Sequence, residues 1–123
     1  MKVSPYIFFD GNCKDAIAYY EAIFGVKAQI MPNPEDDSKV YHAQIPIGGD
    51  FIMFCDSYDP VKTGNHMMIT INFTEDEKST ITSAFNALSE GGETLMELAE
   101  VPWSKYFGLV IDKFGIKWNM CQS

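Results

Sequence analysis

The same order of secondary-structure patterns occurs twice along the 123 residues, and this repeat constrains the fold more than any other feature. In the first half, the apolar run 6–9 predicts a short strand, and Asn12 is placed to cap a helix that Gly25 ends. The polar stretch 32–39 is expected to be a loop. Three further strands are expected in this half, at 27–31, 40–47 and 50–56.

The second half has the same order. Thr74 and Glu77 have the spacing of a capping box, which predicts the start of a second helix. The apolar face of this helix is expected to consist of Ile81, Ala84, Phe85 and Leu88. Strands are expected at 67–73, 94–98, 107–111 and 116–121. The last two alternate apolar residues around the turn 112–115, which indicates an antiparallel hairpin.

This repeat predicts an α+β fold of two βαβββ modules. Each module supplies one helix for four strands, so one face of each curved, antiparallel-rich sheet needs cover from a second sheet or a partner chain. We therefore expect the sheets to surround a cavity, and the chain to form a homodimer. The chain is predicted to be one domain, residues 1–123, with modules at 1–57 and 66–123 joined by residues 58–65.

Composition excludes several partners. The net charge is −8 and all nine basic residues are Lys, so neither nucleic acid nor an anionic membrane is an expected partner. No stretch is apolar for long enough to span a bilayer, and the start of the chain does not read as a signal peptide. Cys13, Cys55 and Cys121 are odd in number and widely spaced, which predicts neither disulfides nor a zinc knuckle. We expect a cytoplasmic protein.

Several motifs give the chain a family resemblance. They are the segment 6–13 with Ala16, the pairs 19–20 and 24–25, the segment 40–45, the turn 48–49, Trp103, the pair 107–108 and the segment 112–118. With them the chain resembles the vicinal oxygen chelate superfamily of glyoxalases, bleomycin-resistance proteins and extradiol dioxygenases. Within it, the chain is most similar to the PhnB-like branch, often labelled 3-demethylubiquinone 3-methyltransferase-like. The resemblance covers nearly the whole chain and implies the two-module fold.

Metal enzymes of this superfamily place His, Glu or Gln on the first and last strands of each module, around one divalent ion. The matching positions here are occupied by Tyr6, by Met53, Phe54 or Cys55, by Met67 or Met68, and by Asn119. These are poor ligands for a hard divalent ion, so no cofactor is expected and a divalent metal is not supported by the ligand residues. The methyltransferase label is equally uninformative, because no glycine-rich turn follows a strand in a parallel sheet.

His42 is the candidate catalytic residue. It lies in the middle of a predicted strand, on the face opposite Tyr41, Ala43 and Ile45, where an imidazole can serve as a base or a hydrogen-bond donor. A structural histidine is the alternative interpretation. The candidate pocket-lining residues are Tyr6, Phe8, Phe54, Cys55, Met68, Trp103, Phe107 and Asn119. Core filling is the alternative for Trp103, and a buried, inert thiol is the alternative for Cys55.

Two functions follow as hypotheses. The first is a metal-independent protein that binds a small, neutral aromatic or hydrophobic compound, as bleomycin-resistance proteins do by sequestration. The second is an enzyme of the same superfamily, either metal-dependent with atypical ligands or a metal-free catalyst that uses His42. A structural or interaction module is the third and weakest interpretation, because the fold is expected to enclose a cavity.

Overall fold

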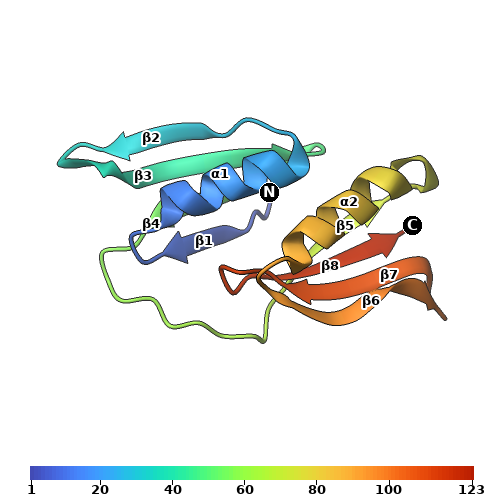
Figure 1. Ribbon diagram of the computed structural model, residues 1–123. Coiled ribbons are helices and arrows are strands. Elements are labelled where there is room, and N and C mark those ends of the chain that lie inside the picture. The colour runs from blue at the N-terminus through green and yellow to red at the C-terminus, as the bar shows by residue number, and fades with distance from the viewer. The chain divides into compact units, whose positions relative to one another are not determined.

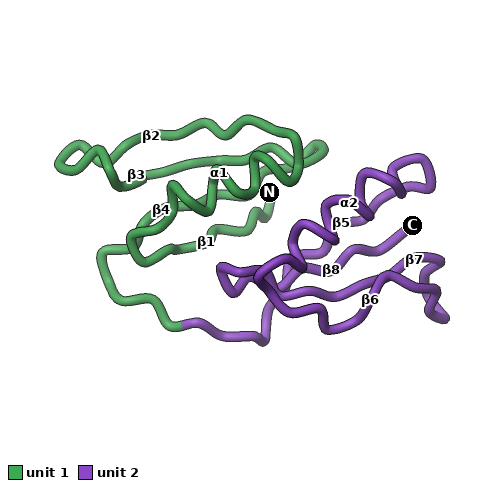
Figure 2. Tube along the Cα trace, viewed as in Figure 1, with its two compact units in different colours: residues 1–62 green, residues 63–123 purple.

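The computed structural model describes residues 1–123 and divides into two compact units, residues 1–62 and 63–123 (Figures 1 and 2). The boundary lies within the predicted joint 58–65. Each unit contains one long α-helix and one four-stranded mixed sheet, and the elements follow the order strand, helix, three strands. The predicted α+β fold of two βαβββ modules is therefore confirmed.

Unit 1 places its first and last strands side by side. Its elements are β1 (Tyr6–Phe9), α1 (Cys13–Phe24), β2 (Gln29–Asn33), β3 (Asp36–Ile47) and β4 (Asp50–Asp56). The sheet order is β1-β4-β3-β2, in which β1 is parallel to β4 and the other neighbours are antiparallel.

Helix α1 covers one face of this sheet with Ala16, Ile17 and Tyr20, all buried (Figure 1). Gly25 ends the helix in the left-handed conformation, as expected. Asn12 occupies the predicted N-cap position, but its side chain makes no capping hydrogen bond. Asp56 of β4 instead accepts the hydrogen bond from the Cys13 N–H at 3.0 Å, so the sheet itself holds the start of the helix.

The prediction of a loop at 32–39 is wrong. Strand β2 continues to Asn33 and β3 begins at Asp36, so most of this polar stretch belongs to a hairpin. The alternation in β3 breaks at Tyr41, because Met31 pairs with His42 whereas Pro32 pairs with Val40. Tyr41 is left out of the ladder and is exposed, and Val40 takes the buried position instead.

Unit 2 repeats this arrangement with β5 (Ile69–Phe73), α2 (Lys78–Ser89), β6 (Glu93–Val101), β7 (Ser104–Ile111) and β8 (Lys117–Gln122). The sheet order is β5-β8-β7-β6, and the predicted hairpin of β7 and β8 is confirmed. A 3₁₀ helix, Glu75–Glu77, precedes α2 and carries the predicted capping box of Thr74 and Glu77. The buried residues of α2 are the four that the sequence predicts: Ile81, Ala84, Phe85 and Leu88.

Neither helix of the structure has the length and apolar character that a crossing of a lipid bilayer requires.

Candidate functional site

The face of the unit 1 sheet that is turned away from α1 carries the candidate site. Side chains alternate between the two faces of a strand, and Ala43, Ile45, Ile52 and Phe54 take the face that packs on the helix. The register therefore gathers a second set of side chains on the opposite face. We call this set the open face; its members are Tyr6, Phe8, Met31, His42, Gln44, Met53 and Cys55.

Tyr6 and His42 form the polar centre of the open face. The Tyr6 hydroxyl lies 2.9 Å from Nδ1 of His42, a hydrogen-bond distance, although 36 residues separate the two along the chain. The Tyr6 ring also stacks on Phe8, with ring centroids 5.4 Å apart and planes inclined by 26°. Tyr6 and Phe8 remain 42% and 55% exposed, so this aromatic platform is accessible. An accessible stack beside an imidazole can bind a flat molecule.

Cys55 adjoins this pair from strand β4. The register that pairs Ala43 with Phe54 places His42 opposite Cys55, and the pairing of β1 with β4 brings Tyr6 to the same face. Burial is the main cause that raises the pKa of the Cys55 thiol, and the nearby Asp56 carboxylate raises it further. Burial also raises the pKa of Tyr6. Cys55 therefore stays a protonated thiol near neutral pH and is a poor nucleophile.

Two methionines complete the open face. Met31 of β2 is the register partner of His42, and Met53 of β4 is the register partner of Tyr6. Met53 was predicted only at a possible metal-ligand position, and Met31 was not predicted at the site. Met31 lies in the predicted strand 27–31, but with a loop expected at 32–39 the register that pairs Met31 with His42 was not predicted.

Two predicted pocket residues lie elsewhere. Phe54 faces α1, is fully buried, and stacks on Tyr20 with ring centroids 5.6 Å apart. It belongs to the core of unit 1, and the structure does not bring it to the open face. Met68 precedes β5, which begins at Ile69 rather than at the predicted residue 67, and its side chain is exposed.

The remaining predicted residues belong to unit 2. Trp103 lies in the turn between β6 and β7, is 66% exposed, and meets Phe107 edge-on with ring centroids 5.3 Å apart. Core filling is therefore not the role of Trp103. Asn119 is buried, and its Nδ2 donates to the backbone oxygens of Gly108 and Met120 at 3.0 and 3.2 Å. The amide of Asn119 thus serves the sheet backbone.

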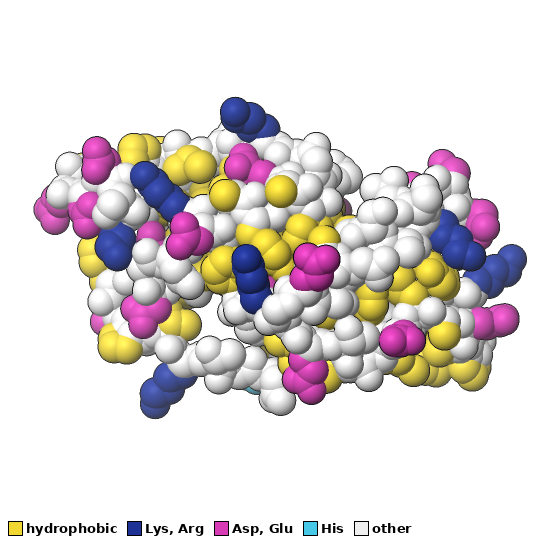
Figure 3. Space-filling model, viewed as in Figure 1, with side chains coloured by type: hydrophobic (Ala, Val, Ile, Leu, Met, Phe, Trp, Pro, Cys, Tyr) yellow, Lys and Arg dark blue, Asp and Glu magenta, His cyan; other side chains and the backbone are white.

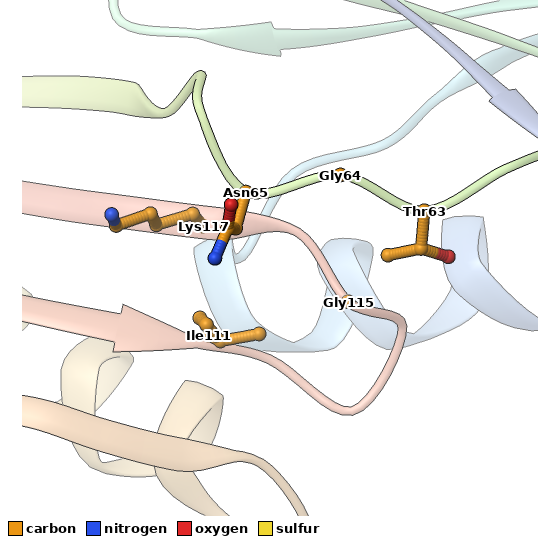
Figure 4. A pocket seen from close by; sticks show the side chains of 6 residues that line it. All are labelled: Thr63, Gly64, Asn65, Ile111, Gly115 and Lys117. Atoms are coloured by element: carbon orange, nitrogen blue, oxygen red, sulfur yellow. The ribbon is translucent and has the colours of Figure 1, made fainter.

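Unit 2 also has an open concavity of about 390 Å³ (Figure 4). Its lining residues are Thr63, Gly64, Asn65, Ile111, Gly115 and Lys117. Figure 4 shows Asn65 on the segment before β5 and Lys117 at the start of β8. The lining includes no carboxylate, thiol or imidazole, so it offers one ammonium group and an amide but no acid–base pair. No pattern in the sequence predicted this concavity.

The side chains do not fit the hard divalent ion that metal enzymes of the resembled superfamily hold. No group of three or more His, Cys, Asp or Glu side chains is arranged to hold a metal ion in residues 1–123. At the matched positions, Asn119 serves the backbone and Met68 lies outside the strand. Hard ions such as Mg²⁺ or Mn²⁺ prefer several oxygen ligands, whereas the open face offers sulfur atoms, an imidazole, a phenol and the single amide of Gln44.

Figure 3 shows the charged side chains on one face of the protein. On the face drawn in Figure 3, Lys side chains are spread among Asp and Glu side chains and do not gather into one basic patch. The net charge of −8 also disfavours the binding of a polyanion.

Comparison with known proteins agrees with this fold. Protein YjdN of Escherichia coli (strain K12) is 31% identical over 96% of this chain and 92% of its own length. The structure of protein PA1353 from Pseudomonas aeruginosa is similar with a TM-score of 0.88, at 29% identity over 100% of this chain and 98% of that one. The structure of a putative 3-demethylubiquinone-9 3-methyltransferase, PhnB protein, from Bacillus cereus has a TM-score of 0.81, at 26% identity over the whole of both chains.

These neighbours confirm the resemblance to PhnB-like proteins. The family model described as Glyoxalase/Bleomycin resistance protein/Dioxygenase superfamily matches residues 2–120, and the chain therefore belongs to that superfamily.

Proposed function

We propose that the protein binds a small, neutral aromatic or hydrophobic compound on the open face of unit 1, without a metal ion. The observation that carries the proposal is the accessible stack of Tyr6 on Phe8, with His42 hydrogen-bonded to the Tyr6 hydroxyl. Large apolar side chains left exposed side by side are typical of binding surfaces. Membership of a superfamily that includes bleomycin-resistance proteins supports the proposal.

The chemistry of the open face favours an uncharged ligand. Its members include no Lys, Asp or Glu, and the chain has no Arg, so nothing there can form a bidentate clamp on a carboxylate or phosphate. Tyr6 and His42 supply hydrogen-bonding groups that can orient a polar substituent on an apolar ring. Met31 and Met53 are flexible and polarisable, so they can adapt to ligands of different shape.

The experiment is a thermal-shift screen of the full chain against neutral aromatic compounds, followed by calorimetric titration of each hit. A ligand that binds only the folded state raises the melting temperature as its concentration rises. Tyr6→Ala removes half of the stack and should weaken binding by about 1 to 2 kcal/mol, roughly tenfold. Tyr58→Ala removes an aromatic ring that is 84% exposed outside the open face and serves as the matched control.

The proposal fails if no neutral aromatic compound stabilises the protein, or if Tyr58→Ala weakens the binding of a hit as much as Tyr6→Ala does. Tyr6→Phe separates the two elements of the site, because it keeps the ring and removes the hydroxyl that contacts His42. A ligand held by stacking alone should bind this variant unchanged.

A second candidate function is metal-free catalysis by His42. The observation that favours it is the Tyr6–His42 hydrogen bond, since a phenol that contacts one ring nitrogen fixes the orientation of the imidazole for proton transfer at the other. The test is turnover of the compounds that bind. If His42→Ala abolishes product formation and leaves the affinity unchanged, the protein is an enzyme; if no hit is converted, it is a binding protein.

Two further expectations belong to the same proposal. Each unit covers one face of its sheet with a single helix, and we propose a homodimer as the assembled form. Sedimentation velocity should give about twice the mass of one chain, 13.9 kDa, and a single-chain mass would contradict it. All three cysteines are free, which supports a reducing, cytoplasmic location.

A further inference from the structure

The open face gathers soft metal ligands, namely sulfur atoms and an imidazole, in place of the oxygen ligands of a hard-metal site. Cys55, His42 and Met31 lie on three neighbouring strands, β4, β3 and β2, and follow one another across the sheet. Neighbouring strands are about 4.8 Å apart, so side chains on the same face of adjacent strands can share one ion. Met53 lies on the same face, two residues from Cys55 along β4.

The Tyr6 hydroxyl marks where such an ion would lie. This hydroxyl is 2.9 Å from Nδ1 of His42, and the Cys55 thiol on the neighbouring strand β4 interacts with the same Tyr6 side chain. An atom in the place of the hydroxyl therefore has both the sulfur and the imidazole nitrogen within reach. Tyr6 is 42% exposed, so a rotation of its side chain toward solvent would vacate this position.

We propose that the open face of unit 1 is a site for a copper(I) ion, held by the Cys55 sulfur and the His42 imidazole, with a thioether of Met31 or Met53 as third ligand. Thiolate and thioether sulfur select Cu(I), whereas Zn²⁺ takes Cys, His and carboxylate ligands in a four-coordinate site. The ion replaces the thiol proton of Cys55, which passes to water, and the oxidation state of copper does not change. This inference does not depend on the binding of an aromatic compound.

Unit 2 contains a natural control for this site. The pairing of Phe9 with Asp56 in unit 1 corresponds to that of Phe73 with Gln122 in unit 2, so Cys121 occupies the place that Cys55 has in unit 1. The residue paired with Cys121 is Phe107, which offers no ligand atom. A thiol alone is thus present in unit 2, and a thiol next to an imidazole is present in unit 1.

The test is an anaerobic competition in which the full chain takes Cu(I) from its coloured complex with bicinchoninate. Wild-type protein should remove one equivalent per chain. Cys55→Ser and His42→Phe should each weaken Cu(I) binding by about 100-fold, whereas Cys121→Ser should leave it unchanged. His42→Phe copies the residue of unit 2, and circular dichroism checks that each variant is folded. Tyr6→Phe should bind Cu(I) at least as tightly as the wild type, because it removes the hydroxyl that competes for His42.

A second measurement observes the imidazole of His42 directly. In proton–nitrogen spectra that observe the side-chain nitrogens, Cu(I) should shift one ring nitrogen of His42 and leave those of His66 unchanged. The proposal is overturned if the wild type takes no Cu(I) from the chelator, or if folded Cys55→Ser or His42→Phe protein binds as tightly as the wild type. It is also overturned if Cys121→Ser causes the same loss as Cys55→Ser, because the ion would then not be held by unit 1 alone.

Discussion

The indole Nε1 of Trp118 donates a hydrogen bond of 2.8 Å to Oδ2 of Asp112, across the turn that joins β7 to β8. Asp112 is 2% exposed and also accepts, at Oδ1, hydrogen bonds from the backbone N–H groups of Phe114 and Ile116 at 2.8 and 3.1 Å. One carboxylate therefore closes the turn and satisfies the polar atom of a fully buried indole. A buried donor without an acceptor is costly, so Asp112 ties the hairpin to the core of unit 2.

Asp112→Ala should accordingly destabilise the protein by about 2 to 4 kcal/mol, because three donors lose their acceptor. Asp112→Asn keeps one oxygen and should cost less. Denaturant unfolding measures both, with the exposed Glu97→Ala as the control. A midpoint for Asp112→Ala equal to that of the control would show that the turn does not need this carboxylate.

In unit 1 a carboxylate also holds separate elements together, and this residue is Asp56. Its Oδ1 accepts from the Cys13 N–H at 3.0 Å and its Oδ2 from the Val40 N–H at 2.8 Å, so it connects α1 to β3. Asp56→Ala should destabilise unit 1 by about 2 kcal/mol. Hydrogen exchange should show faster exchange at the start of α1 and around Val40, with Asp56→Asn intermediate. If exchange rises equally in all strands, the effect is global and this assignment is wrong.

Local sequence patterns correctly predicted those features that depend on residues close together in the chain. The capping box at Thr74 and the buried face of α2 depend on residues three or four apart, and both are confirmed. The part of the hairpin beyond Pro32 was missed because its residues are polar and exposed. They are held by backbone pairing, which the hydropathy of side chains does not reveal. The cap of α1 was missed because Asp56 is 43 residues away from Cys13.

The same distinction applies to the candidate site. The position of His42 on the face opposite Ala43 and Ile45 followed from alternation, but its partner Tyr6 is 36 residues away. No local pattern connects such a pair, since it results from the parallel pairing of β1 with β4. Phe54 was assigned to the pocket for a related reason. The adjacent residues Phe54 and Cys55 were both assigned to the pocket, and only the register decides which of them faces the helix.

Gly108 should be sensitive to the smallest possible addition. A Cβ at this position would lie 2.8 Å from the Phe85 ring of α2 and 2.9 Å from the Leu98 side chain, both closer than carbon atoms pack. Gly108→Ala should therefore destabilise unit 2 by about 1 to 3 kcal/mol by forcing the helix and sheet apart. Gly49→Ala is the matched control, because nothing lies within 4 Å of a Cβ there. Equal melting temperatures for the two variants would contradict this account.

Cys13 should make the stability of the protein depend on alkaline pH. Burial, followed by the nearby Asp56 carboxylate and Cys55, raises the pKa of the Cys13 thiol from 9.0 to about 12. The folded state therefore holds the thiol proton more tightly than the unfolded state. The stabilisation is fully present below about pH 9 and is lost as the pH rises toward 12.

Cys13→Ala removes this titration. Between about pH 8 and about pH 10, the wild type should lose about 1 kcal/mol more of its free energy of unfolding than Cys13→Ala does. Urea unfolding at the two pH values measures the difference, and Cys121→Ser controls for the loss of a thiol elsewhere. Because only the change with pH is compared, the cavity left by the alanine does not enter. Parallel losses in the wild type and Cys13→Ala would mean that the buried thiol does not link folding to proton binding.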